Sequence, residues 1–420
     1  MDNIKDSMLD SIPFARPYIG KEEEEAVLAV LRSLWLTTGR ECLEFEREFG
    51  EFLSRSKAAD TAPAAQEELY CLALNSATSG LHLALEACGL GTGDLVLMPS
   101  MTFAASAEVA RYLGAEVYFI DTVKGGYHMD AACLERALQK IEKGRAKAVM
   151  PVHYGGLPCD MDAIMDIARR YDLKVIEDAA HSFPSLIPNS SLSTCHSPLI
   201  YAGTIGDVGV FSFYATKTLT TGEGGMLVTR DKKIAERVKI MRSHGIDRSI
   251  WDRYTDTKAS WYYQVVEAGY KYNMPDLLAA IGRVQLRRAM ELLAMRAEIA
   301  RLYDEAFSAC EHLILPPTGP GDARHLYPLR LALEKLSIDR DEFAIKMQER
   351  GIGVSVHFIP LHTMPYYKKR YSLRNEDLSE TLDTYRRSIS LPIWPGMSRE
   401  QIEHVITVVK TLSYEYNRTH

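Results

Sequence analysis

Seven short apolar runs alternate with longer stretches in this chain, and this alternation limits the possible fold more than any other feature. The runs span residues 72–74, 95–99, 117–120, 148–152, 175–178, 208–213 and 226–229. Most of them are separated by helical patterns, such as those over residues 104–113 and 161–171. Strands that alternate with helices build a mostly parallel sheet covered by helices on both faces. We therefore predict an α/β fold with a mostly parallel seven-stranded sheet.

The rest of the chain has a different pattern, which predicts a second, smaller domain. A long helical pattern begins at Asp276 and extends to about Ala309. Beyond it, the sequence predicts a strand near residues 326–331, a helix over 340–350, a strand over 354–358 and a helix from Ser398. A chain of 420 residues, 46% of them hydrophobic, is long enough for two cores. We predict a large domain over residues 1–275, and a linking helix with a smaller α+β domain over residues 276–420.

Charge and cysteine content exclude several classes of protein. The formal net charge of −7 leaves no basic excess for binding nucleic acid. No apolar run reaches the length of a membrane span, and residues 1–13 contain acidic residues where a secretory signal has an apolar core. The seven cysteines are scattered with no CxxC pair, so neither a disulfide framework nor a metal site is expected. A reducing cytoplasm is the predicted location.

Lys217 is the first candidate functional residue. It lies in a turn between two apolar runs, 208–213 and 225–228. Partial burial there would make its amine a nucleophile toward an aldehyde, as a lysine that forms a Schiff base requires. The alternative is an ordinary solvated lysine in a turn.

A second group of candidates follows the apolar run that ends at Asp178. Ligands bind at the carboxyl ends of strands in open α/β sheets. If Lys217 holds pyridoxal phosphate (PLP), a carboxylate such as Asp178 must keep the pyridine nitrogen protonated. Asp178 could instead cap a helix over the alanines that follow it. His181 could cover the PLP ring or bond its phenolic oxygen, or it could be a core histidine.

Hydroxyl side chains supply a candidate phosphate site. Thr78 and Ser79 come between an apolar run and a helical pattern, and the N-terminus of a helix binds phosphate. Helix capping alone would also explain either residue. Ser212, five residues before Lys217, could add a third hydroxyl. Phe103 follows another apolar run and could stack on a planar ring or belong to the core.

Together these segments resemble the DegT/DnrJ/StrS family of PLP-dependent aminotransferases, which act on nucleotide-linked keto sugars. The resemblance extends nearly from end to end, because several separate motifs occur in the right order. The motifs lie at residues 12–17, 35–39, 211–225, 351–358 and 390–392. The resemblance implies the type I fold of PLP-dependent aminotransferases and PLP as cofactor.

The resemblance also implies a role for each candidate. Lys217 would form the Schiff base with PLP, Asp178 would contact the pyridine nitrogen, and His181 would lie beside the ring oxygen. The implied cofactor contacts further include a stacking ring, Phe103, and three phosphate ligands, Thr78, Ser79 and Ser212. The implied neighbours of the sugar nucleotide are His153, Tyr154, Tyr214, His357 and Phe358, of which the histidines, Tyr154 and Phe358 could instead be packing residues.

Relatives form homodimers with shared active sites, and this chain departs from their pattern at the motif concerned. A Gly-Tyr-Asn-Tyr-Arg type motif places an Asn on the phosphate of the neighbouring subunit in relatives, whereas residues 269–274 here read Gly-Tyr-Lys-Tyr-Asn-Met. Either Lys271 or Asn273 would make that contact, or both would only support the turn before residue 276.

The implied reaction is ping-pong transfer of an amino group. The donor would be an amino acid, by resemblance L-glutamate, and the acceptor a nucleotide-linked keto sugar, with a 4-keto-6-deoxy sugar expected. The product would serve the biosynthesis of amino sugars, including surface polysaccharide. One alternative is sugar dehydration by a related enzyme class, which carries histidine where this chain has Lys217. Another is a non-catalytic PLP-binding regulatory protein.

Two segments look like insertions into the family pattern. Residues 58–68 are rich in alanine and are expected to form an exposed loop. Residues 184–205 are rich in serine and proline and join the Asp178 run to the Lys217 segment. We expect this longer loop to border the sugar pocket or to be a surface excursion.

Overall fold

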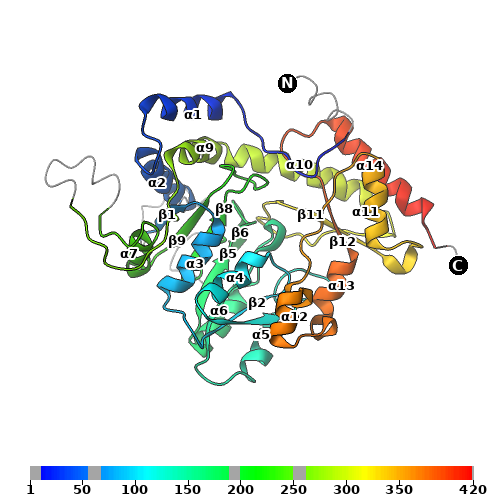
Figure 1. Ribbon diagram of the computed structural model, residues 1–420. Coiled ribbons are helices and arrows are strands. Elements are labelled where there is room, and N and C mark those ends of the chain that lie inside the picture. Colours follow the sequence, from blue (N-terminus) through cyan, green and yellow to red (C-terminus); the bar gives the residue numbers. More distant parts are fainter. Residues whose placement is uncertain (1–10, 55–67, 189–198, 249–261, 419–420) are drawn as a thin grey trace.

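The computed structural model describes residues 11–54, 68–188, 199–248 and 262–418 (Figure 1). The predicted loop over residues 58–68 lies almost entirely outside these ranges, as does the tip of the 184–205 segment. No helix in the described ranges is long and apolar enough to span a membrane.

A seven-stranded sheet forms the centre of the fold, with strand order β1-β9-β8-β5-β4-β2-β3. The strands are β1 (Tyr70–Leu74), β2 (Leu95–Pro99), β3 (Glu116–Ile120), β4 (Ala146–Val149), β5 (Lys174–Asp178), β8 (Val208–Ser212) and β9 (Gly225–Thr229). β9 pairs antiparallel with β1 and β8, and the other pairings are parallel. The prediction of a mostly parallel seven-stranded sheet is confirmed.

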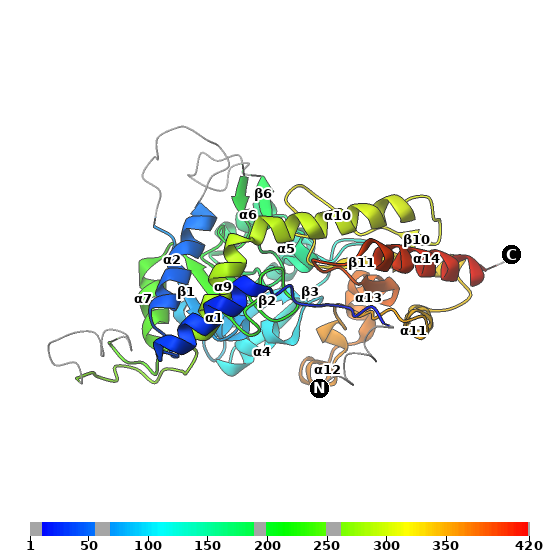
Figure 2. The ribbon, with the colours of Figure 1, turned by 90° about the horizontal axis from the view of Figure 1, so that it is seen from above.

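Helices cover both faces of this sheet (Figures 1 and 2). The first face packs against α3 (Ala77–Ala87), α4 (Ala104–Tyr112) and α7 (Lys232–Met241). The other face packs against α2 (Arg40–Ser54), α5 (Ala131–Leu138), α6 (Met161–Tyr171) and α9 (Asp276–Arg287). Along β8, Val210 belongs to the first cluster and Phe211 to the second, because successive side chains of a strand point to opposite faces. Strands buried on both faces give the continuous apolar runs seen in the sequence.

A second core surrounds a three-stranded antiparallel sheet. Its strands are β10 (Leu313–Ile314), β11 (Tyr327–Leu331) and β12 (Ser388–Leu391), and α10 (Ala289–Phe307), α11 (Arg340–Glu349) and α14 (Arg399–Glu415) pack around them. Two further helices, α12 (Pro365–Tyr371) and α13 (Ser379–Arg387), lie between β11 and β12 in the chain. Figure 2 shows α10, β11 and α14 extending away from the large sheet.

The structure corrects two expected elements. The helix expected over residues 276–309 is divided at Arg288 into α9 and α10. The strand expected over residues 354–358 does not form, because this segment pairs with β12 only at Ser355 and Ser390 before it enters a cavity described below.

The predicted division at residue 275 is crossed by packing in both directions. Ile12, near the N-terminus, pairs with Ile352 and belongs to the second core. Leu361 and Tyr367, from the C-terminal part, pack in the cluster on the first face of the large sheet. The domain boundary therefore stays a prediction, while these contacts show that the N-terminal end packs on the second core and that residues near 361–367 pack on the large sheet.

Candidate active site

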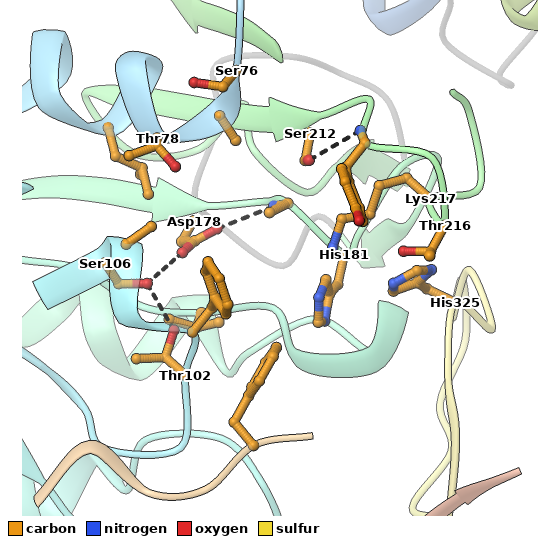
Figure 3. Close-up of a pocket in the computed structure, with 18 of the residues that line it drawn as sticks. Ser76, Thr78, Thr102, Ser106, Asp178, His181, Ser212, Thr216, Lys217 and His325 are labelled. Atoms are coloured by element: carbon orange, nitrogen blue, oxygen red, sulfur yellow. Dashed lines mark hydrogen bonds between the residues drawn. The ribbon is translucent and has the colours of Figure 1, made fainter. Parts of the chain in front are cut away.

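A cavity of about 460 Å³ lies at the carboxyl ends of β1, β2, β4, β5 and β8 (Figure 3). Its walls come from the turns that follow these strands and from three residues of the C-terminal part, His325, His357 and Phe358. This is the place where open α/β sheets bind ligands. The fold thus brings together segments that are up to about 280 residues apart in the chain, from Ser76 to Phe358.

Lys217 lies in the wall of this cavity, in the turn after β8. Its backbone N–H donates to the Tyr214 carbonyl at 2.9 Å. Burial lowers the pKa of the Lys217 amine to about 7, the nearby Asp178 carboxylate opposes this shift, and the Arg296 guanidinium adds to it. A large fraction of the amine is therefore unprotonated near pH 7, as a nucleophile requires.

This depressed pKa predicts how the apoprotein captures an aldehyde. The rate of imine formation between Lys217 and added pyridoxal phosphate should rise with pH to a midpoint near 7 and then level off, instead of rising toward the usual lysine pKa of 10.5. Stopped-flow absorbance at a series of pH values measures this rate. In Asp178→Asn the midpoint should move to lower pH, because the carboxylate that favours the charged amine is gone. A midpoint above pH 9 in the parent protein would contradict imine formation by a lysine with the lowered pKa of Lys217.

Asp178 ends β5 and faces the same cavity. Its Oδ2 accepts a hydrogen bond from Ser106 Oγ at 2.7 Å, and its Oδ1 accepts one from the Ala180 N–H at 3.2 Å. Thr102 Oγ1 lies 2.7 Å from Ser106 Oγ, which extends the network (Figure 3). Burial raises the pKa of Asp178, while these hydrogen bonds oppose the rise. No helix follows Asp178, so the helix-capping alternative is wrong.

The N-terminus of α3 forms a hydroxyl-rich corner of the cavity. Ser76 is the N-cap and accepts from the Ser79 N–H at 3.1 Å. The Ser79 hydroxyl donates to the Ser76 carbonyl at 2.8 Å and does not line the cavity, whereas Thr78 and Ser212 do. A Cβ at Gly225 would lie 2.6 Å from the Ser76 and Ala77 backbone, so glycine permits this close approach of β9. The corner suits a phosphate group.

Two of the predicted ring contacts line the cavity. Phe103 is 61% exposed at its rim and 5.9 Å from the Phe358 ring, so it is not a core residue. His181 is buried, and its Nδ1 accepts from the Gly155 N–H at 3.3 Å. The His181 proton is therefore on Nε2, which makes that nitrogen a hydrogen-bond donor. Burial lowers the pKa of His181 well below its usual value.

The five expected neighbours of the substrate divide into two groups. Tyr214, His357 and Phe358 line the cavity, whereas His153 and Tyr154 do not. His153 is fully buried, lies 2.9 Å from Glu177 Oε2 and accepts from the Cys159 N–H. Tyr154 donates to the His357 carbonyl and stacks on Tyr127 at 4.3 Å. Both residues support the wall from behind.

Lys271 and Asn273 also lie outside the cavity of their own chain. Lys271 is exposed, and its carbonyl accepts from Asn75 Nδ2 at 3.3 Å. Asn273 donates to Thr38 Oγ1 at 2.6 Å, and its buried Oδ1 has no partner among the described residues. Their predicted contact with a neighbouring subunit stays a prediction.

The loop over residues 184–205 does not border the cavity in its described part. β6 (Leu186–Pro188) and β7 (Leu199–Tyr201) form a two-stranded sheet that packs away from it, and Leu186 bonds the Gly321 carbonyl. Residues 189–198 lie outside the described ranges.

Sequence reasoning missed several cavity residues. These are Ser76, Thr102, Ser106, Thr216 and His325. Thr102 lies two residues before α4 and Ser106 lies in its first turn. Two hydroxyl side chains so close to a helix N-terminus could have been recognised in the sequence as candidate ligands. His325 carries no local signal, because it reaches the cavity from a distant part of the chain.

The donor set fits PLP. An amine, a buried carboxylate and a hydroxyl-rich helix N-terminus face one cavity, matching the aldehyde, the pyridine nitrogen and the phosphate. The aromatic rings of Phe103 and Phe358 at the same cavity suit a planar group.

Comparisons with known proteins agree with this chemistry. The sequence profile of the DegT/DnrJ/EryC1/StrS aminotransferase family matches residues 17–410. The spore coat polysaccharide biosynthesis protein SpsC of Bacillus subtilis is 39% identical over 404 residues, covering 96% of this chain and 97% of SpsC.

Two solved structures extend the comparison. Spr1654 from Streptococcus pneumoniae, solved in a PLP form, has a TM-score of 0.82 and 28% identity and covers 96% of this chain and 99% of its own. PseC of Helicobacter pylori, an aminotransferase of pseudoaminic acid biosynthesis, has a TM-score of 0.83 and 26% identity and covers 97% of this chain and 100% of its own. The chain belongs to the DegT/DnrJ/EryC1/StrS family and is a PLP-dependent aminotransferase.

Proposed function

We propose that this enzyme transfers the amino group of L-glutamate to a nucleotide-linked 4-keto-6-deoxy sugar. The observation that carries the proposal is that Lys217 and Asp178 face one cavity. The lysine argues against a dehydratase, which has histidine there, and the intact pair argues against a degenerate binding protein. Relatives concerned with polysaccharide and pseudoaminic acid biosynthesis support a sugar acceptor. The product would enter the biosynthesis of amino sugars for surface polysaccharide.

Lys217 and Asp178 have different roles in the proposed reaction. PLP, when bound, supplies an electron-withdrawing ring. The Lys217 amine, unprotonated to a large extent near pH 7, removes the proton from the α-carbon of the donor and delivers it during the return step. Asp178 holds a proton on the pyridine nitrogen, and Ser106 orients its carboxylate.

The outer part of the cavity suits the nucleotide portion of the acceptor. Phe103 and Tyr214 are 61% and 48% exposed at its rim, so their rings are available to stack on a base. We place the reaction in the cytoplasm, which fits the six described cysteines, all of them unpaired.

The acceptor is tested by incubating the purified holoenzyme with L-glutamate and a panel of nucleotide-linked 4-keto and 3-keto sugars. Mass spectrometry of the products should show exchange of the keto oxygen for an amino group with a 4-keto-6-deoxy sugar. Lys217→Ala is the matched control for non-enzymatic amination. Products from 3-keto sugars alone would show that the acceptor carries its keto group at C3 instead of C4. The absence of product with every sugar would contradict the proposed function.

We further propose that each active site is shared between two chains, and subunit mixing tests this. One parent is Lys217→Ala; the other is a Lys271→Glu, Asn273→Ala double variant, which weakens a contact with the partner's phosphate site. Such a charge-assisted contact contributes about 1.5–3 kcal/mol. In a mixed dimer one site carries both lesions and the other carries none, so activity should partly return. Inactive heterodimers formed from folded parents would show that this motif does not act across the dimer.

A further inference from the structure

In the proposed amino transfer, on which this inference rests, the cavity must bind the α-carboxylate of the amino-acid donor. An α-carboxylate is separated from the amine by one carbon. Its receptor must therefore lie beside Lys217, the position where that amine reacts. Among the described residues that line the cavity, Lys217 is the sole cation, and no arginine is present to hold a carboxylate.

Three side chains of the cavity lie near Lys217. Figure 3 shows Thr216 and His325 on the side away from Asp178, and His181 between them and Asp178. The Thr216 hydroxyl makes no hydrogen bond within the described ranges, although it lines the cavity. The His325 ring lies 4.5 Å from the His181 ring and is 4% exposed. This side therefore offers hydrogen-bonding groups whose capacity the folded chain does not use.

Three histidines line the cavity, and His325 differs from the other two because its Nδ1 has no hydrogen-bond partner among the described residues. His181 Nδ1 is bonded to the Gly155 N–H, and His357 Nδ1 lies 2.9 Å from Ser390 Oγ. His325 Nδ1 is buried and has no partner among the described residues. Because the bond made by one ring nitrogen fixes the tautomer, the protein leaves the tautomer of His325 to be set by a ligand.

A buried cation lies behind His325. Arg296, on α10, is 3% exposed and donates to the carbonyls of His325 and Ile393 at 3.2 and 2.6 Å. Among the described residues no carboxylate forms an ion pair with Arg296, whose pKa is lowered by burial alone and whose Nε has no hydrogen-bond partner. Uncompensated positive charge makes the adjacent wall favourable for an anion.

We propose that His325, together with the Thr216 hydroxyl, binds the α-carboxylate of the amino-acid donor, on a wall made electropositive by Arg296. The arrangement also suits the second substrate. A sugar presents neutral hydroxyls at the same position, and an imidazole can donate to or accept from a hydroxyl. An arginine there would favour the donor and leave a charge unpaired when the sugar binds.

The test measures binding of glutarate, a carboxylate without an amino group, to the holoenzyme by calorimetry, alongside binding of a nucleoside diphosphate. His325→Gln should weaken glutarate binding by about ten- to a hundredfold, because a charge-assisted hydrogen bond is lost. Nucleoside diphosphate binding should change by less than about twofold. In single-turnover kinetics with L-glutamate, the apparent dissociation constant should rise by a similar factor, more than the limiting rate falls.

Two further variants test whether the loss of glutarate binding is specific to side chains of the cavity. Thr216→Val keeps the shape of a half-buried side chain and should weaken glutarate binding by about three- to tenfold. His82→Gln removes another buried histidine with an unpartnered ring nitrogen, outside the cavity, and should leave glutarate binding unchanged.

Parent-like glutarate binding in both His325→Gln and Thr216→Val would overturn the proposal. Equal loss of glutarate and nucleotide binding would also overturn it, since His325 would then only support the wall. Failure of every sugar in the acceptor panel leaves this measurement intact, so the two proposals fail separately.

Discussion

Replacing Lys217 with alanine is expected to lower the rate of amino transfer by at least about 10⁴-fold, because the change removes both the nucleophile and the base that moves the α-proton. The side chain lines the cavity, and burial brings its pKa to about 7. The variant should fold, since the carbonyl and N–H of the turn do not depend on the side chain. Turnover with L-glutamate and the best sugar of the panel measures the loss.

A chemical readout accompanies the kinetics. Borohydride treatment of the parent holoenzyme should fix the cofactor on the peptide that contains Lys217, as mapped by mass spectrometry, and Lys217→Ala should carry no fixed cofactor. The exposed Lys271 provides a matched internal control, because its peptide should stay unlabelled in both proteins. Transamination by Lys217→Ala at the parent rate would show that Lys217 is not a catalytic residue.

The large sheet could be predicted because its strands are buried on both faces. Such strands read as continuous apolar runs, and each of the seven runs became a strand. The smaller sheet was harder to predict. β12 contains Ser388 and Ser390, both buried, which break the apolar pattern. Residues 354–358 have the composition of a strand, but His357 and Phe358 face the cavity instead of a neighbouring strand.

His153 and Ser79 were predicted to contact substrate or cofactor but do not line the cavity, and both errors have the same geometric cause. Asp178 and Val152 line the cavity, whereas their neighbours Glu177 and His153 pair with each other on the opposite side. Successive side chains of an extended segment alternate between faces, so nearness to a strand end does not fix which way a residue points. Likewise, one step along α3 turns Ser79 back to the Ser76 cap while Thr78 faces the cavity.

Replacing Asp178 with asparagine is expected to slow the half-reaction with L-glutamate by about 10³-fold. Asparagine keeps the shape and can still accept from Ser106 Oγ, so the cavity should persist and the cofactor should still bind. The negative charge that holds a proton on the pyridine nitrogen is lost, and the ring then withdraws electrons less strongly. Stopped-flow absorbance of the cofactor during a single turnover measures the rate.

Ser106→Ala separates the charge of Asp178 from its orientation. This change removes the 2.7 Å hydrogen bond to Oδ2 but leaves the carboxylate and its bond from the Ala180 N–H. Because the Ser106 bond lowers the pKa of Asp178, its loss should raise that pKa further and slow the half-reaction by about tenfold. The expected order of rates is parent, Ser106→Ala, Asp178→Asn. An Asp178→Asn protein as fast as the parent would show that the charge of Asp178 is not needed and that its side chain only holds the end of β5 in place, through the one hydrogen bond with Ser106 that asparagine keeps.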